Sequence, residues 1–281
     1  RLAFPLRAGR LQSKGIHIMH RLSTMLGLAC AAASPVFAQP TIVESGWYLA
    51  EEFALNGAYS ARFNAADGRI YAASRVTGST GGIYVFDDSG VATHLVTVDT
   101  PAGLAVEADG DLFYALDTPG TIERLPFLST TPVTWVTGFH TVDDDPIGLA
   151  IAPANARFTW LNPGDALVAD RGNSGPDEVW KWSPDVAEGE TVVHADGGSI
   201  LVNPVDVAIG ASRVYIADDV GTGLGIIYSL AADGTVTPMP GPGVSRPAAI
   251  AIDPSTQDLI VNDAELDRIV RIDEQTGTVS D

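Results

Sequence analysis

The chain has 281 residues, and its 35 Asp and Glu against 16 Lys and Arg give a formal net charge of −19 at pH 7. A field of this sign repels phosphate backbones, so nucleic acid is not an expected partner. The single cysteine, Cys30, leaves no pair for an internal disulfide and no thiolate set for a zinc site. A chain of this length can bury a substantial core as one domain.

Residues 19–38 have the features of a bacterial secretory signal peptide. A basic start is followed by a short apolar run at 26–33 and then by Val36-Phe37-Ala38. The residues at the first and third positions before the cut suit signal peptidase, so we expect cleavage after Ala38 and a secreted or periplasmic protein. The apolar run is too short to span a bilayer, and no transmembrane segment is expected.

Residues 1–18 begin with Arg rather than Met, and they hold four Arg or Lys and no acidic residue. We interpret them as translated upstream sequence that is not native to the protein. Removal of residues 1–38 takes away five basic residues and leaves a formal charge of −24. Such a charge attracts cations, but it is also typical of solubility or of adaptation to salt.

One sequence pattern recurs along the chain. It consists of a proline, a small apolar run, a polar turn and a second apolar run, and its copies start at Pro101, Pro146, Pro204 and Pro247. The steps are 45, 58 and 43 residues, and a degenerate earlier copy begins near Tyr59. Short runs rich in Val, Ile, Leu and Ala, without a sustained helical spacing, predict an all-β fold.

Each copy predicts four antiparallel strands, which is typical of the blades of a β-propeller. The first strands are expected at 103–106, 148–151, 207–209 and 250–252. The third strands are expected at 81–87, 120–126, 177–183, 225–231 and 267–273, and the clearest fourth strand at 92–98. The domain is expected at 45–281, with an outer strand near 45–55. Five copies are visible, and because the last ends early in its fourth strand, we expect six blades with a truncated C-terminus.

The pattern of a proline, a small apolar strand and a strand ending in Ala-Asp resembles the NHL repeat. It also resembles the wider six-bladed group that includes the gluconolactonase and senescence-marker-protein lactonases. The resemblance covers roughly residues 55–281. It implies the propeller fold and says little about function, because such propellers host many activities.

The lactonases of this group hold a metal with carboxylate and amide side chains that face the axis, typically including the residue after the repeat proline. The corresponding residues here are Ala102, Ile147, Val205 and Ala248, with Ser60 in the first copy. None of them offers a carboxylate, and Asp206 is the one weak candidate for a metal ligand nearby. The departure speaks against a lactonase.

The loops after the second strands and before the first strands open on the same face of a propeller. The acidic residues that fall there are Asp117, Asp143, Asp144, Asp145, Asp170, Asp218, Asp219 and Asp263. One interpretation is an acidic funnel for calcium or a cationic ligand. The other, favoured because the pattern recurs from blade to blade, is that each strand-ending Asp accepts backbone N–H bonds in its own turn. Trp160, in the extended turn of its copy, is the best candidate for an exposed aromatic contact.

No other residues form a recognisable catalytic centre. His94, His140 and His194 fall in or after the fourth strands of different blades, and we interpret them as surface residues. No G-x-S-x-G elbow is present. The sequence favours a secreted binding module for a small molecule, a glycan or a protein, with calcium as the one ion considered. A metal-dependent hydrolase or lyase with ligands displaced to Asp206 and the acidic loops stays open as the alternative.

Overall fold

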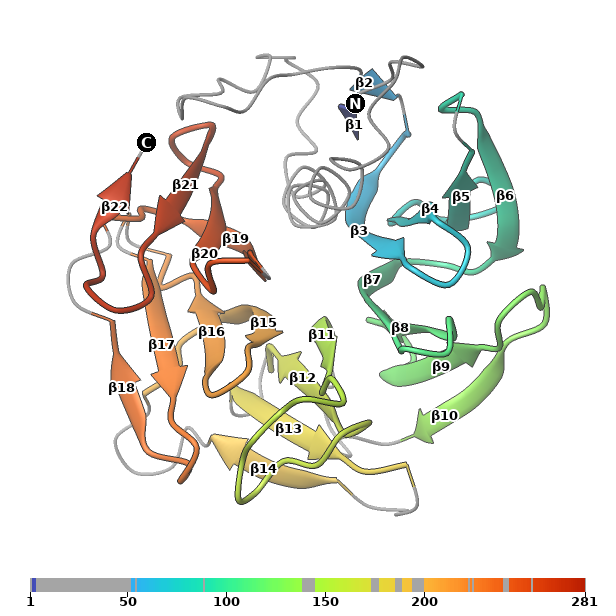
Figure 1. Ribbon diagram of the computed structural model, residues 1–281. Coiled ribbons are helices and arrows are strands. Elements are labelled where there is room, and N and C mark those ends of the chain that lie inside the picture. The colour runs from blue at the N-terminus through green and yellow to red at the C-terminus, as the bar shows by residue number, and fades with distance from the viewer. Residues whose placement is uncertain are drawn as a thin grey trace, which may run out of the picture.

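Five four-stranded antiparallel sheets surround a common axis in the computed structural model, as the blades of a β-propeller (Figure 1). The structure describes residues 2–3, 52–53, 55–87, 89–137, 145–172, 177–184, 189–193, 200–221, 223, 225–239, 243–253 and 255–280. Within these residues there is no helix, and the all-β prediction is confirmed. The described strands account for five blades, and a sixth is not among them.

The blades follow one another in chain order, and each uses four consecutive strands. Blade 1 consists of β3 (Ala58–Asn64), β4 (Arg69–Ser74), β5 (Gly82–Phe86) and β6 (Ala92–Thr97). Blade 2 consists of β7 (Pro101–Val106), β8 (Leu112–Leu116), β9 (Thr121–Leu125) and β10 (Val133–Thr137). Blade 3 consists of β11 (Pro146–Ile151), β12 (Ala166–Asp170), β13 (Glu178–Trp182) and β14 (Glu190–Val193).

The last two blades repeat this plan. Blade 4 consists of β15 (Pro204–Ile209), β16 (Val214–Asp218), β17 (Ile226–Leu230) and β18 (Val236–Pro238). Blade 5 consists of β19 (Pro247–Ile252), β20 (Leu259–Asp263), β21 (Arg268–Ile272) and β22 (Val279–Ser280). A separate short sheet pairs β1 (Leu2–Ala3) with β2 (Glu52–Phe53), which is the part of the strand expected near 45–55 that the structure describes as paired. The rest of 1–38 lies outside the described residues.

The observed first strands start at the repeat proline, two or three residues earlier than the sequence predicted. Proline is tolerated there because it is the first residue of the strand and needs no ladder donor. In blade 3, Pro146 pairs with Asp170 and Gly148 pairs with Ala169, so Ile147 between them is an extra, bulged residue. Blades 1, 4 and 5 show the same register shift. A bulge redirects a side chain, and in these four blades it affects the second residue of the innermost strand.

The innermost strands β3, β7, β11, β15 and β19 lie side by side around the axis in chain order (Figure 1). Small residues permit this approach. A Cβ added at Gly148 would lie 2.5 Å from the Cα of Asp206, and one at Gly103 would lie 2.6 Å from the Ile147 carbonyl oxygen. These glycines are needed because neighbouring backbones meet there.

At the same strand position, blades 1 and 4 carry a polar residue that ties one blade to the next. The Ser60 hydroxyl accepts the Leu104 N–H at 3.2 Å, and the Asp206 carboxylate accepts the Ile250 N–H at 3.1 Å. Each donor is the fourth residue of the neighbouring innermost strand. Neighbouring innermost strands are therefore joined at this position in one of two ways: by direct backbone contact at a glycine, or by a hydrogen bond to a polar side chain.

The hydrophobic core is divided among the junctions between blades. The cluster between blades 2 and 3 contains Phe113, Leu149 and Trp182, and the cluster between blades 3 and 4 contains Val179 and Ile216. Burial of one such aliphatic side chain contributes about 1.5–3 kcal/mol. Stability is thus spread over the junctions. The described residues include no helix long and apolar enough to cross a membrane.

Candidate ligand site at the axial mouth

The residue directly after the second strand has the same position in all blades, on the face where the first strands begin. These residues are Arg75, Asp117, Arg171, Asp219 and Ala264. In blades 1, 3, 4 and 5 its backbone N–H donates to the carbonyl just before the first strand, as in the 3.1 Å bond from Arg171 to Asp145. The backbone position is constant, and the side chain differs from blade to blade.

The strand-ending aspartates Asp170, Asp218 and Asp263 lie one residue earlier and are buried. Each accepts N–H bonds from the segment that enters the first strand of its own blade. Asp218 accepts the Asn203 N–H at 2.6 Å, and Asp170 accepts the Asp145 N–H at 2.9 Å. Asp263 does the same with two N–H groups at 3.0 and 3.1 Å. These carboxylates close the blade entry and leave few lone pairs for a ligand.

Asp117 does not belong with these strand-ending residues, although the sequence pattern grouped it with them. Pro101 pairs with Leu116, so Leu116 has the place that Asp170 has in blade 3. Asp117 is the counterpart of Arg171 instead. The register therefore corrects the sequence alignment by one residue and gives Asp117 a different environment.

Charged residues of three blades converge at Asp117. Arg75 of blade 1 forms an ion pair with Asp117 of blade 2. Asp145 of blade 3 lies close enough to Asp117 for each carboxyl group to shift the pKa of the other. Asp145 also accepts bonds from Nε and Nη2 of Arg171, at 3.0 and 2.5 Å, and lies 4.0 Å from Arg75. Two neighbouring carboxyl groups thus lie between two guanidinium groups.

Tyr59 completes this group. Because Ala58 occupies the proline position of blade 1, the residue that matches Ala102 and its counterparts is Tyr59, not Ser60 as the sequence predicted. The guanidinium carbon of Arg75 lies 5.0 Å from the centroid of the Tyr59 ring, a cation–π contact. We refer to Tyr59, Arg75, Asp117, Asp145 and Arg171 as the axial cluster.

The two carboxyl groups of the axial cluster titrate differently. The pKa of Asp145 is raised to about 6, by burial first and then by its interaction with Asp117. Burial also raises the pKa of Asp117, but the hydrogen bond from Asp145 and the charge of Arg75 outweigh it and lower that pKa below its usual value. When the pair takes up a proton as the pH falls, Asp145 therefore binds it before Asp117.

Two further groups of the cluster region have raised pKa values. Burial raises the pKa of Tyr59, and the charges of Asp145 and Asp206 add to this against those of Arg75 and Arg171. Burial and then the charge of Asp218 raise the pKa of Asp177 to about 6. Perturbed titrating groups that gather in one place are typical of functional sites.

Asp206 lies deeper along the axis and is only 6% exposed. Its oxygens accept the N–H of Val207 at 3.0 Å and of Ile250 at 3.1 Å, and Arg62 lies 3.7 Å away. Burial raises its pKa, although Arg62 acts in the opposite direction. Within the described part of the chain, no three His, Cys, Asp or Glu side chains are placed to share one metal ion.

The other residues proposed from the sequence do not meet at the cluster. Asp219 pairs with Arg246 at 3.0 Å on the same face. His94 is exposed and stacks on Tyr84 with ring centroids 4.6 Å apart. The remaining ones, Asp143, Asp144, His140 and His194, lie outside the described residues.

Trp160 lies in the connection between β11 and β12, at the opposite end of the blade from the axial cluster. Its indole N–H donates to the Ala231 carbonyl at 3.2 Å, and its ring packs on the core between blades 3 and 4. Thr159 beside it donates its N–H to the Ala232 carbonyl at 3.1 Å. The extended turn of blade 3 is therefore hydrogen-bonded to blade 4.

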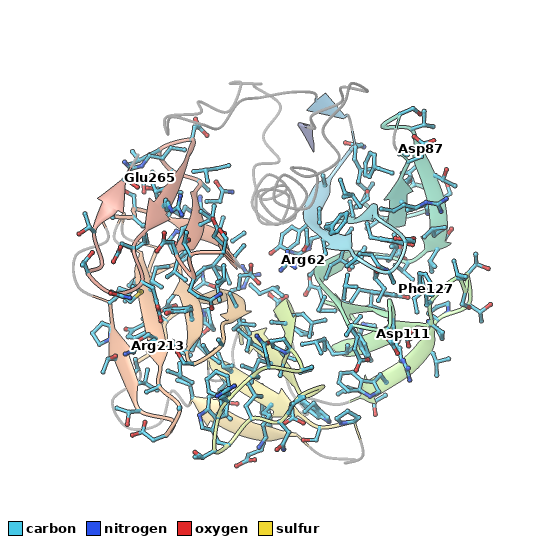
Figure 2. All side chains as sticks on the ribbon, viewed as in Figure 1. Arg62, Asp87, Asp111, Phe127, Arg213 and Glu265 are labelled. Carbon is cyan, nitrogen blue, oxygen red and sulfur yellow. The ribbon has the colours of Figure 1, made fainter. Side chains whose placement is uncertain are left out.

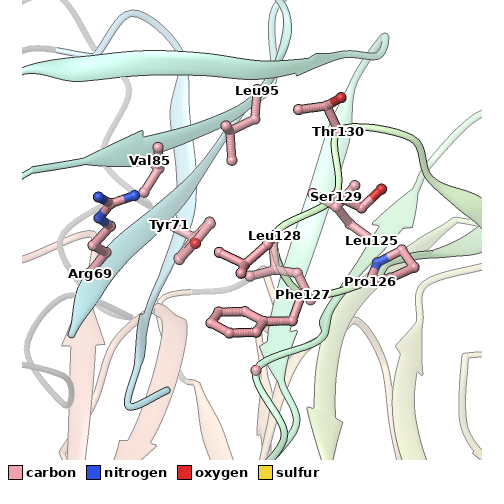
Figure 3. A pocket seen from close by; sticks show the side chains of 12 residues that line it. Arg69, Tyr71, Val85, Leu95, Leu125, Pro126, Phe127, Leu128, Ser129 and Thr130 are labelled. Carbon is pink, nitrogen blue, oxygen red and sulfur yellow. The ribbon is translucent and has the colours of Figure 1, made fainter. Parts of the chain in front are cut away.

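A shallow groove of about 160 Å³ lies between blades 1 and 2, away from the axis. Figure 3 shows Phe127 and Leu128 facing Tyr71 across it. Leu128 is 80% exposed and has a φ of +62°, so the turn holds an apolar side chain in solvent. Only Arg69 brings a charge to its lining. Few polar groups converge here, whereas a ligand site usually needs several.

Of the axial cluster, only the aspartates were identified from the sequence. The aspartates were visible in the repeat, but Tyr59, Arg75 and Arg171 were not singled out. A residue-by-residue comparison of the position after each second strand would have found both arginines, because they alternate there with Asp117 and Asp219. Tyr59 was hidden because its copy lacks the proline that marks the others.

No family model matches the chain, and no curated protein matches its sequence. Solved structures do match its fold. A chain of the nidogen–laminin complex aligns with a TM-score of 0.66 and 16% identity, over 83% of each chain. Virginiamycin B lyase from Staphylococcus aureus aligns with a TM-score of 0.57 and 16% identity, over 81% of this chain and 70% of the lyase.

An auxiliary nutrient-binding protein from Bacteroides ovatus also aligns, with a TM-score of 0.58 and 15% identity. The match covers 74% of this chain and 57% of that protein, so it spans little more than half of the relative. At these identities the similarity establishes the fold and not an activity.

Proposed function

We propose that the chain is a secreted β-propeller binding module of the NHL type, whose ligand contacts the axial cluster. The observation that carries the proposal is that Asp117 and Asp145 of neighbouring blades lie between Arg75 and Arg171, beside the ring of Tyr59. Two neighbouring carboxylates oppose folding unless their repulsion is offset. A strained polar arrangement built from three blades at the axis is more typical of a ligand site than of a structural contact.

The chemistry of the axial cluster favours a neutral ligand with several hydroxyl groups, such as a sugar unit of a glycan. Its carboxylate oxygens accept hydrogen bonds, its guanidinium groups donate them, and the phenol of Tyr59 does both. At neutral pH the two guanidinium charges balance those of the two carboxylates, so the cluster is a poor trap for cations. One aligned relative is described as nutrient-binding, which is compatible with this use of the fold.

The test is calorimetric titration of the purified protein with neutral oligosaccharides, including maltotetraose, xylotetraose and cellotetraose. At least one is expected to bind, and Asp117→Asn and Arg75→Gln should each weaken that binding about tenfold or more. Asp219→Asn is the matched control, because Asp219 lies on the same face and pairs with Arg246 outside the cluster. Equal binding by all variants, or no binding of any oligosaccharide, would refute the proposal.

The alternative is a metal-dependent hydrolase or lyase that uses Asp206 at the axis. Asp206 already accepts two backbone N–H bonds and faces Arg62, so we expect no tight divalent ion there. Titration with calcium, zinc and manganese, repeated on Asp206→Ala, decides between the two. A micromolar site that is lost in the variant, together with lactone turnover, would establish the enzyme in place of the binding module.

A further inference from the structure

A second hollow of about 260 Å³ lies on the axis, towards the face opposite the axial cluster. Its lining comes from the final residues of β7, β11, β15 and β19, and from Arg62 and Phe63 of β3. All five blades therefore contribute to it. Figure 2 shows Arg62 at the axis, whereas Asp87 and Arg213 lie at the periphery. Among its lining residues Arg62 alone carries a charge.

Backbone groups of the innermost strands also face this hollow. Glu107 and Ala152, directly after β7 and β11, donate their N–H groups to the carbonyls of Asp111 and Asp165, directly before the second strands of their blades. Because such bonds alternate along an antiparallel strand, Val106 and Ile151 just before them turn their N–H and C=O groups to the other side, towards the axis. The hollow thus offers backbone hydrogen-bonding groups beside apolar side chains.

The Arg62 guanidinium has few partners for its five N–H donors. Its Nη1 donates to the Ala61 carbonyl at 3.0 Å and approaches the Ser60 hydroxyl at 3.4 Å. The nearest carboxylate oxygen among the described residues is that of Asp206, 3.7 Å from Nη2 and beyond hydrogen-bonding distance. Asp206 itself is bonded to the N–H groups of Val207 and Ile250. The guanidinium side chain is 20% exposed, towards the hollow that it lines.

We propose that this axial hollow binds a small polar monocarboxylate, whose carboxylate pairs with Arg62 and whose amide or hydroxyl groups bond to the backbone of the innermost strands. A guanidinium and a carboxylate form charge-assisted bonds in a fork geometry. A cation would meet the charge of Arg62, and a purely apolar molecule would leave the donors unpaired. The negative charge of the whole protein opposes the anion at long range, but salt screens that repulsion beyond about 8 Å.

The probe is N-acetylglycinate, and N-acetylglycinamide is its matched neutral analogue. Binding is followed by titration with ligand-observed NMR at physiological salt. The carboxylate is expected to bind in the millimolar range or tighter, and the amide about tenfold more weakly. Arg62→Gln should weaken binding of the carboxylate about tenfold, and Arg213→Gln, a peripheral control, should leave it unchanged.

Asp206→Asn should change the affinity for N-acetylglycinate in the opposite direction, because it removes the carboxylate of the protein that competes with the ligand for Arg62. It should tighten binding of the carboxylate severalfold, which loss of structure cannot imitate. If Arg62→Gln does not fold, Arg62→Lys takes its place and should retain the preference for the carboxylate with reduced affinity. The proposal fails if N-acetylglycinate does not bind, if the amide binds equally well, or if binding is unaffected by the Arg62 substitutions. These outcomes are independent of whether the axial cluster binds oligosaccharides.

Discussion

Arg171 and Asp145 are joined twice, by a 3.1 Å bond from the Arg171 backbone N–H to the Asp145 carbonyl and by bonds from the guanidinium to the Asp145 carboxylate. The backbone bond fixes the base of the arginine side chain, and the carboxylate fixes its end. Little side-chain entropy is left to be lost when a ligand arrives, which favours affinity. The Asp145 carboxyl group is the titrating partner of this pair.

Asp145→Asn is expected to change how stability depends on pH. The pKa of Asp145 is about 6 in the folded protein against 3.8 in the unfolded chain. The folded state therefore holds this proton more tightly, and its contribution to stability, present below pH 3.8, is lost as the pH rises through about 6. The asparagine side chain cannot titrate, so Asp145→Asn does not lose this contribution. The free energy of unfolding of Asp145→Asn, relative to that of the original protein, should therefore rise by on the order of 1–3 kcal/mol between about pH 4 and 7.

Chemical denaturation at several pH values measures this difference. Asp177 titrates in the same pH range in both proteins, so its contribution cancels when their pH profiles are compared. Parallel pH profiles for the two proteins would show that the pKa of Asp145 is not raised in the folded state.

Asp218→Ala and Asp170→Ala are expected to cost stability rather than to remove a specific activity. Each carboxylate accepts N–H bonds at the entry to its blade, and a buried donor left unpaired costs about 1–3 kcal/mol. The melting temperature of each variant should fall, while binding at the axial cluster persists below that temperature. Unchanged melting combined with lost binding would instead place these residues in the ligand site.

Gly148→Ala is expected to destabilise the junction between blades 3 and 4. The added Cβ would lie 2.5 Å from the Asp206 Cα and 2.9 Å from the Val205 carbonyl oxygen, so the strands must separate. Overpacking of this kind costs about 1–3 kcal/mol. The control is Ala249→Gly, since blade 5 carries alanine at the same position, and its cost should be smaller. Denaturant midpoints of both variants give the comparison, and equal midpoints would contradict it.

The mature protein is expected to begin at Gln39. The short apolar run and Val36-Phe37-Ala38 suit cleavage by signal peptidase, and the result would be a secreted or periplasmic chain. Mass spectrometry of the N-terminus of material exported by a bacterial host checks this. Exported protein that still carries residues 1–18 would show that the segment is native after all.

The architecture could be predicted from sequence because each blade repeats local signals. Pro146 marks the start of an innermost strand, and runs such as 214–217 are short and apolar throughout. All five predicted third strands contain the observed ones, for instance Thr121–Leu125 within 120–126. The repeat also placed the acidic loops on one face, since topology dictates which loops share an end of the blade.

The axial cluster could not be predicted in the same way. Arg75 and Asp117 are 42 residues apart and meet only because two blades pack side by side. The position of Asp117 depends on the register between Pro101 and Leu116, which its sequence motif does not reveal. Whether a loop carboxylate faces a backbone N–H, an arginine or another carboxylate is decided by packing between blades. Residue types along the strand do not encode it.

The extended turn of blade 3 has a mechanical consequence. Neighbouring innermost strands are joined near the axis, and in blade 3 Thr159 and Trp160 also bind the carbonyl groups of Ala232 and Ala231 near the outer rim of blade 4. A chain pulled from its two ends should therefore lose its terminal blades one at a time and release blades 3 and 4 in a single larger extension. In optical tweezers, Trp160→Ala should split that step in two, and a record of equal single-blade steps in the original protein would show that the rim contact bears no load.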